Sequence, residues 1–278
     1  MMIEGFFLIL LYLTICFMKK IFFFVSFFLF LIILTSCFKV KEQVSGSKPI
    51  SHSLFDSLLQ RYVDNDGYVD YRGFRKDSVE FKKYLTLLSN NYPSEKNWSR
   101  EAQMAYWINA YNAFTIKLIC DHYPVTSIKD IKRGIPFVSD TWQINFITIE
   151  NKTYNLNNIE HGILRPKYND PRIHAAVNCA SKSCPKLSHH AYTAENLNVQ
   201  LDEAMRSFIN DPTHNKIISE NKAEMSKIFD WFAGDFKKTS PTVISFINTY
   251  SSKIKLKGNA TLSFLDYDWA LNEQVYAR

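Results

Sequence analysis

The 278-residue sequence predicts an α+β fold: a single domain with a buried central helix and a small mixed or antiparallel sheet. Residues 98–121 carry aromatic and aliphatic side chains around most of a helical circumference, which indicates a helix buried on most sides. Helical periodicity dominates the first half of the chain, whereas short extended segments alternate with helices in the second half. Aromatic residues make up 15% of the sequence and only 8 residues are glycine, a composition that favours a well-packed core.

Residues 1–36 precede the domain and resemble a bacterial lipoprotein signal peptide. Its cationic start is Met18-Lys19-Lys20, an apolar run covers residues 21–34, and Leu34-Thr35-Ser36-Cys37 resembles a lipobox. We expect Met18 to be the true start, which makes residues 1–17 an extension. Because that extension also contains an apolar stretch, an uncleaved membrane anchor is the alternative interpretation.

The resemblance implies that Cys37 becomes the lipidated first residue of an extracytoplasmic protein in the bacterial cell envelope. Lipid chains on Cys37 would bind the membrane, at about 0.8 kcal/mol per buried methylene. Residues 37–50 are small and polar and predict a flexible tether, so that the globular domain covers residues 51–278. The formal net charge of +6 is spread along the chain without an arginine-rich run, so nucleic acid is not expected as a partner.

Two helices and a turn are predicted before the central helix. Apolar residues recur at helical spacing from Leu54 to Tyr62, and residues 79–88 predict a second helix. Between them, Asp64-Asn65-Asp66-Gly67 begins like a calcium-binding loop. The twelfth position of such a loop should be a glutamate, but here it is Arg75, which would repel a cation. A turn at Gly67 is therefore favoured over a calcium site.

The central helix is predicted to follow Ser99, whose hydroxyl can cap the first turn. Asn109 and Asn112 fall on this helix and would lie inside the domain or on the wall of a cleft. Because buried amides need hydrogen-bond partners, both are expected to bond to neighbouring polar groups.

Short strands and helices are predicted to alternate in the rest of the chain. The helix over residues 241–250 would begin with a proline, which suits the first turn of a helix. The expected extended segments are residues 143–149, 172–177, 216–219, 224–231 and 261–267, and the other expected helices are residues 157–165 and 196–209.

Residues 172–185 are the most informative segment of the chain. They place one histidine, one asparagine, two cysteines and two serines where the predicted strand breaks into a loop. Reactive side chains gathered at such a junction are a common arrangement in active sites. In an oxidising compartment, Cys179 and Cys184 could instead form a small disulfide loop. Cys120 lies in an apolar stretch and is expected to be a buried, inert thiol.

Six segments together resemble one known family. They are residues 68–71 (YVDY), 106–113 (YWINAYNA), 159–165 (IEHGILR), 174–185 (HAAVNCASKSCP), 227–236 (KIFDWFAGDF) and 267–272 (YDWALN). In this order they are similar to the family known as domain of unknown function 547, and the resemblance covers nearly the whole mature chain. It implies no substrate, so the chemistry has to be argued from the residues.

The sharpest functional hypothesis is a thiol-dependent hydrolase of amide or peptide-like bonds. Cys179 would be the nucleophile, which has to be a thiolate beside a base. His174 lies five residues earlier, and that odd spacing puts the two side chains on opposite faces of a regular strand unless the strand ends or bulges between them. His161 is the second candidate base.

Other polar residues would support this chemistry. Asn109 or Asn178 could help to form an oxyanion hole, and one of the later acids could orient the base. The candidate substrate-binding residues are Asn178, Ser181, Cys184, Glu160 and Arg165, and the candidate orienting acids are Asp230, Asp235 and Asp268.

Two other functions stay open. A metal site could draw on the six histidine and cysteine side chains between His161 and His190, but they lack a recognised zinc-ligand spacing, so we expect neither a metal nor a cofactor. A non-catalytic envelope binding or assembly module would instead line a carbohydrate or peptide groove with aromatic side chains. Trp107, Trp231 and Trp269 fall in apolar contexts, however, where a place in the core is the plainer interpretation.

Overall fold

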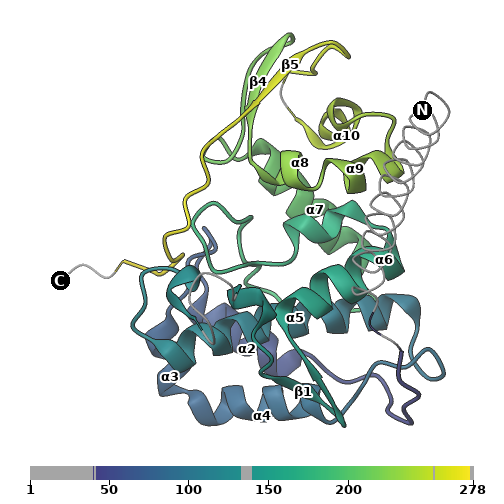
Figure 1. The fold of residues 1–278 in the computed structure, drawn as a ribbon, viewed down its shortest axis with the longest axis vertical. Helices are drawn as coiled ribbons and strands as arrows, with labels where there is room; N and C mark the ends of the chain where they lie inside the picture. Colours follow the sequence, from purple (N-terminus) through teal and green to yellow (C-terminus); the bar gives the residue numbers. More distant parts are fainter. Residues whose placement is uncertain (1–39, 41, 133–139, 253, 276–278) are drawn as a thin grey trace, which may run out of the picture. The chain divides into compact units, whose positions relative to one another are not determined.

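The computed structural model describes residues 40, 42–132, 140–252 and 254–275, all of which belong to one compact unit that begins at Val40. The predicted signal peptide, the lipobox and Cys37 lie outside the described residues. Among the residues that are described, no helix is long and apolar enough to span a bilayer. Helices combine with two small sheets (Figure 1), which confirms the predicted α+β class.

The N-terminal half is helical, as predicted, although it contains one helix, Tyr71–Lys76, that the sequence analysis did not predict. Its helices are α2 (Ser53–Tyr62), α3 (Tyr71–Lys76), α4 (Ser78–Ser89) and α5 (Arg100–His122). The predicted turn between α2 and α3 is also confirmed, because Gly67 has a φ of 80°. A Cβ at Gly67 would lie 2.7 Å from the backbone nitrogen of Leu187, so this turn needs glycine both for its left-handed backbone and for a close contact with a distant loop.

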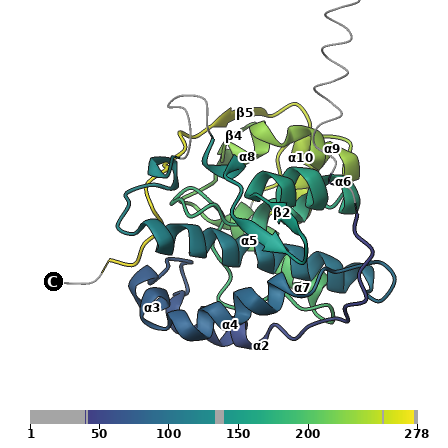
Figure 2. The ribbon, with the colours of Figure 1, turned by 60° about the horizontal axis from the view of Figure 1, so that its bottom comes forward.

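Helix α5 is the predicted central helix. Ser99 caps it by accepting a hydrogen bond from the backbone N–H of Ala102. The side chains of Trp107 and Tyr111 are each only 1% exposed. Figure 2 shows α5 crossing the fold, with α3 and α4 on one side and the C-terminal elements on the other. A polar side chain on this helix therefore has to bond to protein rather than to bulk water.

The described part of the fold contains two small sheets. Strands β1 (Ile147–Ile149) and β2 (Lys152–Tyr154) form an antiparallel hairpin. In the second sheet, β4 (Lys222–Met225) pairs antiparallel with β3 (Lys216–Ser219) and parallel with β5 (Thr261–Phe264). The sheet is therefore mixed, within the range that the sequence predicted.

The remaining elements are short helices around a second buried cluster. Phe236 is central in this cluster, with its ring centroid 4.9 Å from that of Phe229 and 4.8 Å from that of Phe246. The 3-10 helices are η1 (Ile128–Asp130), η2 (Thr141–Gln143) and η4 (Pro171–Ala175), the π-helix is η3 (Asn158–Leu164), and the α-helices are α6 (Arg165–Tyr168), α7 (Leu197–Asn210), α8 (Ile228–Trp231), α9 (Ala233–Thr239) and α10 (Val243–Tyr250).

Residues 265–275 form a strap between the two halves of the domain. In Figure 1 this yellow segment leaves β5 and runs toward α3. Asn272 donates its backbone N–H to Ala180 O and accepts from Val69 N–H, at 3.2 and 2.9 Å. The Tyr71 hydroxyl also donates to Asn272 Oδ1 at 2.6 Å. The strap therefore links the start of α3 to the loop that carries both cysteines.

The predicted strand over residues 172–177 is wrong, because residues 172–175 belong to the 3-10 helix η4 and residues 176–177 are not in a strand. Its local sequence explains the difference. Pro171 suits the first position of a helix, and Asp170 accepts a hydrogen bond from the backbone N–H of Arg172. These capping signals outweigh the apolar character of the segment.

Three more extended segments are shorter than predicted. Of residues 261–267, only Thr261–Phe264 form a strand. Of residues 143–149, only Ile147–Ile149 form a strand. Residues 224–231 leave the sheet at Met225 and turn into α8. Pro241 also precedes the last helix rather than opening it, because Thr242 is the N-cap of α10.

The predicted tether also needs correction. Gln43 Nε2 donates to the Tyr154 hydroxyl at 2.8 Å, and Ser45 Oγ donates to Glu150 Oε1 at 2.5 Å. Trp98 Nε1 donates to the backbone oxygen of Ser47 at 3.1 Å. Small polar residues were interpreted as a flexible linker, but here their hydroxyl and amide groups bond to the domain. The domain therefore starts before Ser51.

Candidate functional site

Five residues singled out in the sequence line one cavity of about 430 Å³, which we call the aromatic pocket. Glu160 and His161 come from η3, His174 comes from η4, and Cys179 and Cys184 come from the loop after η4. The fold therefore brings most of the predicted site together, although the strand expected to carry it is absent.

An aromatic wall, formed by Trp142, Trp231, Tyr267 and Trp269, gives the pocket its name. The ring centroids of Trp231 and Trp269 are 5.9 Å apart, and that of Tyr267 lies 4.5 Å from Trp269. Trp231 remains 47% exposed, so this wall is open to a ligand. The sequence analysis placed Trp231 and Trp269 in the core, because an apolar context does not distinguish a core tryptophan from a pocket tryptophan.

Lys129 places its ammonium nitrogen 3.6 Å from the ring centroid of Trp269. Desolvation is the main cause that lowers the pKa of this lysine, and the nearby carboxylate of Asp140 partly offsets it. The aromatic wall is therefore already in contact with a cation from the protein's own chain.

His174 is buried in the wall of the aromatic pocket, with 2% exposure. Its Nε2 lies 2.9 Å from Asp235 Oδ2, and its ring stacks on Phe232 with centroids 3.9 Å apart. Burial lowers the pKa of His174, although Asp235 and Glu160 act in the opposite direction. A neutral His174 that donates from Nε2 to Asp235 leaves Nδ1 as a proton acceptor.

Asp235, from α9, is the acid that orients this histidine. It also accepts a hydrogen bond from Arg165 Nε at 2.6 Å, and its Oδ1 forms an ion pair with Lys238 Nζ at 2.9 Å. Burial on its own would raise the pKa of Asp235, but the hydrogen bonds from His174, Arg165 and Lys238 together hold it far below the usual carboxyl value. Asp235 is thus an ionised anchor for a neutral imidazole.

The other two candidate orienting acids do not bond to His174. Asp230 pairs with Lys227 at 3.7 Å, and Asp268 accepts from the backbone N–H of Ala270 at 2.8 Å. The sequence could nominate the three aspartates but could not choose among them, because the choice depends on how α9 packs against η4.

Glu160 faces two histidines in the pocket. Its Oε1 lies 4.0 Å from Nδ1 of both His161 and His174. This is beyond hydrogen-bond length, so the carboxylate does not fix the ring of His161. Arg165 does so by donating from Nη1 to His161 Nδ1 at 3.0 Å. Neighbours on an α-helix would point about 100° apart, but the wider turn of a π-helix lets Glu160 and His161 reach the same cavity.

Cys179 and Cys184 are joined in a disulfide. A cystine has no thiolate, so in this state Cys179 cannot attack a substrate as the predicted nucleophile. Neither cysteine sulfur is hydrogen-bonded to an imidazole among the described residues; the side-chain partners are the hydroxyls of Ser181 and Tyr267. Cys120, the predicted inert thiol, is free and half-buried, and burial raises its pKa to about 12.

The asparagines of α5 do not line the aromatic pocket. Asn109 holds Tyr192 through two hydrogen bonds of 2.7 and 3.0 Å. Asn112 bonds in the same way to Ala176 and Asn178, at 2.9 Å each. A role for Asn109 in an oxyanion hole finds no support in this geometry, because its amide is occupied by backbone. Both residues instead hold loops in place.

Asn178 and Ser181 lie on a neighbouring cavity of about 510 Å³. Cys184 lines this cavity as well as the aromatic pocket, so the cystine borders both. Within the described ranges, no three side chains of His, Cys, Asp or Glu are grouped as metal ligands.

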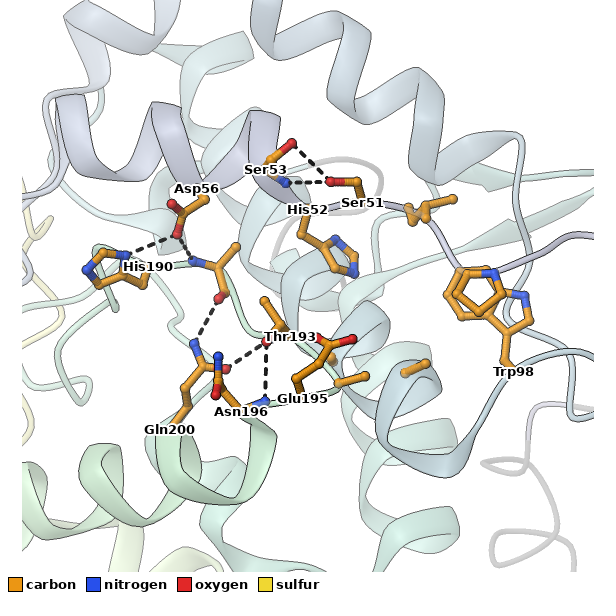
Figure 3. Close-up of a pocket in the computed structure, with 16 residues that line it drawn as sticks. Ser51, His52, Ser53, Asp56, Trp98, His190, Thr193, Glu195, Asn196 and Gln200 are labelled. Atoms are coloured by element: carbon orange, nitrogen blue, oxygen red, sulfur yellow. Dashed lines mark hydrogen bonds and ion pairs between the residues drawn. The ribbon is translucent and has the colours of Figure 1, made fainter.

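Figure 3 shows a third cavity, of about 600 Å³, away from these residues. It is lined by His52 at the start of α2, by Trp98 before α5 and by Glu195 before α7. His52 Nδ1 lies 2.8 Å from the hydroxyl of the fully buried Tyr84. If Tyr84 donates this bond, the proton of the neutral imidazole is on Nε2.

His52 is expected to make stability depend on pH. Desolvation lowers its pKa from 6.5 to about 4, and the carboxylate of Glu195 acts in the opposite direction. Between these two values the unfolded chain binds a proton that the folded protein does not, so stability falls as the pH falls. At pH 5 the loss should be about 2 kcal/mol. Urea unfolding at pH 7.5 and pH 5 should show a smaller difference for His52→Asn than for wild type.

The control for this prediction is His122→Asn, because His122 is exposed at the end of α5. Its pH dependence should match that of wild type. An unchanged pH dependence in His52→Asn would mean that His52 is not the group responsible.

Comparison with known protein families gives one match, which covers part of the chain. Residues 95–209 match the family described as "Protein of unknown function, DUF547". This range is narrower than the sequence resemblance suggested, and it includes α5, η3, η4 and the cystine but not Asp235, Trp231, Tyr267 or Trp269. No curated protein matches the chain, and no solved structure matches it. Residues 95–209 are therefore a DUF547 domain.

Proposed function

We propose that this protein is a lipid-anchored component of the bacterial cell envelope that binds a peptide segment in the aromatic pocket. The observation that carries this proposal is the partly exposed aromatic wall beside the buried pair of His174 and Asp235. Pockets that combine apolar walls with a few fixed polar groups are typical ligand sites. The cystine favours binding over hydrolysis, because it leaves no free thiol in the pocket.

The chemistry of the wall favours a peptide with a basic or aromatic side chain. Lys129 occupies the face of Trp269, and a ligand cation could take the same kind of position on Trp231. Asp140 and Glu160 line the same pocket and would favour a positive ligand electrostatically. His174 Nδ1 and the carboxylate of Glu160 can each accept a hydrogen bond from a backbone or side-chain N–H.

Substitution of the tryptophans in the aromatic wall should weaken peptide binding. Three of the five tryptophans line the pocket, so a peptide with lysine next to an aromatic residue should change the intrinsic fluorescence of the protein. Trp231→Ala and Trp269→Ala should each raise the dissociation constant at least tenfold, as expected for aromatic anchors in a binding site. Fluorescence titration and calorimetry with the same peptide measure this.

Trp98→Phe is the matched control. Trp98 is buried and lines the third cavity instead of the aromatic pocket, so its substitution should leave the affinity for the peptide unchanged. If Trp231→Ala and Trp269→Ala bind the peptide as wild type does, the aromatic pocket is not the binding site.

The anchor is tested separately. Growth with an alkyne-bearing fatty acid should label the full-length protein, and Cys37→Ala should abolish the label. Cys16→Ala should keep it, since Cys16 precedes the proposed start. Equal labelling of the Cys37→Ala variant would exclude lipidation at Cys37.

A second candidate function is the thiol-dependent hydrolase. One observation favours it: a histidine oriented by an aspartate lies in the same pocket as Cys179. This function requires reduction of the cystine. Labelling of the reduced protein with a small electrophile should then be rapid at Cys179 at pH 6 as well as at pH 8. Slow labelling at pH 6 would leave the hydrolase without an activated nucleophile.

A further inference from the structure

We propose that the Cys179–Cys184 cystine is a reaction centre that exchanges its disulfide with the thiol of a peptide bound in the aromatic pocket. The inference rests on the proposed function for its substrate class, and adds a covalent step to it. It is carried by three observations: access to one sulfur, hydrogen bonds to the other, and a wall that can hold the substrate.

Access to the two sulfurs is unequal. Both cysteines line the aromatic pocket, but Cys179 is partly exposed whereas Cys184 is only 6% exposed. An incoming thiolate in the pocket would therefore meet Cys179 first. Attack on Cys179 makes Cys184 the leaving group.

The surroundings of Cys184 suit a leaving thiolate. The backbone N–H of Cys179 donates to Cys184 Sγ at 3.0 Å, and the Tyr267 hydroxyl donates to it at 3.2 Å. Ser181 Oγ in turn donates to the Tyr267 oxygen at 3.0 Å, which leaves the Tyr267 proton free to point at the sulfur. Donors that favour a charged sulfur lower the pKa of the leaving thiol, and a lower pKa makes it leave faster.

Tyr267 keeps its proton during this process. Burial raises its pKa well above the ordinary phenol value, so it acts as a hydrogen-bond donor and not as a base. The hydroxyl also lies 3.4 Å from Cys179 Sγ. Tyr267 can therefore donate a hydrogen bond to whichever of the two sulfurs becomes the thiolate.

The exchange is balanced in atoms and electrons. A substrate thiolate forms a bond to Cys179 Sγ, the Cys179–Cys184 bond breaks, and its electron pair leaves on Cys184 as a thiolate. A second substrate thiolate then attacks the substrate sulfur of the mixed disulfide and releases Cys179 as a thiolate. Two substrate thiols are oxidised to one disulfide, and the cystine is reduced to two thiols. The cystine itself is the oxidant, for one turnover.

The test separates the sulfur chemistry from peptide binding. Oxidised protein with the anchor in place is mixed with reduced glutathione or with a single-cysteine peptide that also carries lysine and an aromatic residue. The mixture is quenched with acid, and mass spectrometry of the protein and its fragments locates the adduct. We expect the adduct on Cys179 and a free thiol on Cys184, formed at least as fast as in urea-unfolded protein.

Tyr267→Phe should slow this exchange about tenfold at saturating peptide, where a change in affinity does not contribute to the rate; the ring that packs on Trp269 is retained. Tyr250→Phe is the matched control, since it removes a half-buried hydroxyl bonded to Asp202 outside the pocket, and its exchange should be unchanged. The Cys184→Ser variant should form a stable mixed disulfide at Cys179 with an oxidised peptide.

Three results would overturn the inference. They are exchange much slower than in the unfolded chain, adducts mainly on Cys184, and an unchanged rate in Tyr267→Phe. Each would mark the cystine as a structural cross-link while leaving peptide binding intact. Loss of peptide binding with normal glutathione exchange would instead refute the proposed peptide site and leave the sulfur chemistry standing.

Discussion

Replacing Asn112 by alanine should lower the free energy of unfolding by about 2–6 kcal/mol, because it leaves two buried backbone groups without a partner at about 1–3 kcal/mol each. These groups are the carbonyl of Ala176 and the N–H of Asn178, each 2.9 Å from the Asn112 amide. Both residues are buried, so water cannot replace the lost bonds readily. Urea unfolding followed by circular dichroism measures the change.

The expected effect reaches the candidate site as well as the core. Ala176 and Asn178 lie between His174 and Cys179, so loss of the Asn112 bonds should loosen the segment that carries both. Asn97→Ala is a matched control, because its amide bonds to backbone oxygens at an exposed position. That variant should lose no more than about 1 kcal/mol. Equal losses in the two variants would contradict the special role of Asn112.

Asp235→Ala is expected to lower the free energy of unfolding by about 3 kcal/mol, because it removes the carboxylate shared by Arg165, His174 and Lys238. This is the low end of the range for broken buried ion pairs, since the Arg165 side chain keeps 30% exposure. The same variant frees His174 from its orienting partner and should weaken peptide binding in the aromatic pocket. Chemical unfolding and fluorescence titration measure the two effects independently.

The sign of the pH dependence follows from the lowered pKa of Asp235. Its contribution is complete above the ordinary carboxyl value of 3.8 and is lost as the pH falls below it. Wild type should therefore lose stability below pH 3.8 more steeply than Asp235→Ala. Asp66→Ala serves as the control, because its pair with Lys186 is largely exposed and should contribute at most about 1 kcal/mol. A stability loss in Asp66→Ala as large as that expected for Asp235→Ala, or no loss in Asp235→Ala, would contradict the stabilising role of the Asp235 carboxylate.

Local patterns predicted much of the fold. The central helix followed from aromatic and aliphatic side chains around most of its circumference and from the cap at Ser99, and the turn at Gly67 followed from its glycine and the charge of Arg75. Helix α7 followed from its periodicity. In these cases the signal lies within one segment, so the sequence contains all of it.

Two kinds of signal were harder to predict: those that compete within one segment, and those that depend on a partner elsewhere in the chain. η4 was expected to be a strand because its apolar residues were weighed more heavily than the capping pair of Asp170 and Pro171. The segment before Ser51 was expected to be free because the sequence does not show which groups its hydroxyls would meet.

The candidate site was predicted in part. The residues from Glu160 to Cys184 were identified and share one pocket, because they are close in the sequence and reactive in type. The aromatic wall was missed, since Tyr267 and Trp269 reach the pocket from a segment almost 90 residues beyond Cys179. The choice of disulfide over free thiols also stayed open, because two cysteines five residues apart are compatible with both.

The strap has a consequence for the order of events during biogenesis. A nascent polypeptide that ends at β5 contains Cys179 and Cys184 but lacks Tyr267 and Trp269, and it also lacks Asn272, to which Val69 bonds in the complete fold. Such an intermediate can build the helical half around α5 but cannot complete the wall that encloses its sulfurs. Cross-linking of the two cysteines could therefore precede closure, and the cavity would be completed only after the final segment is translated.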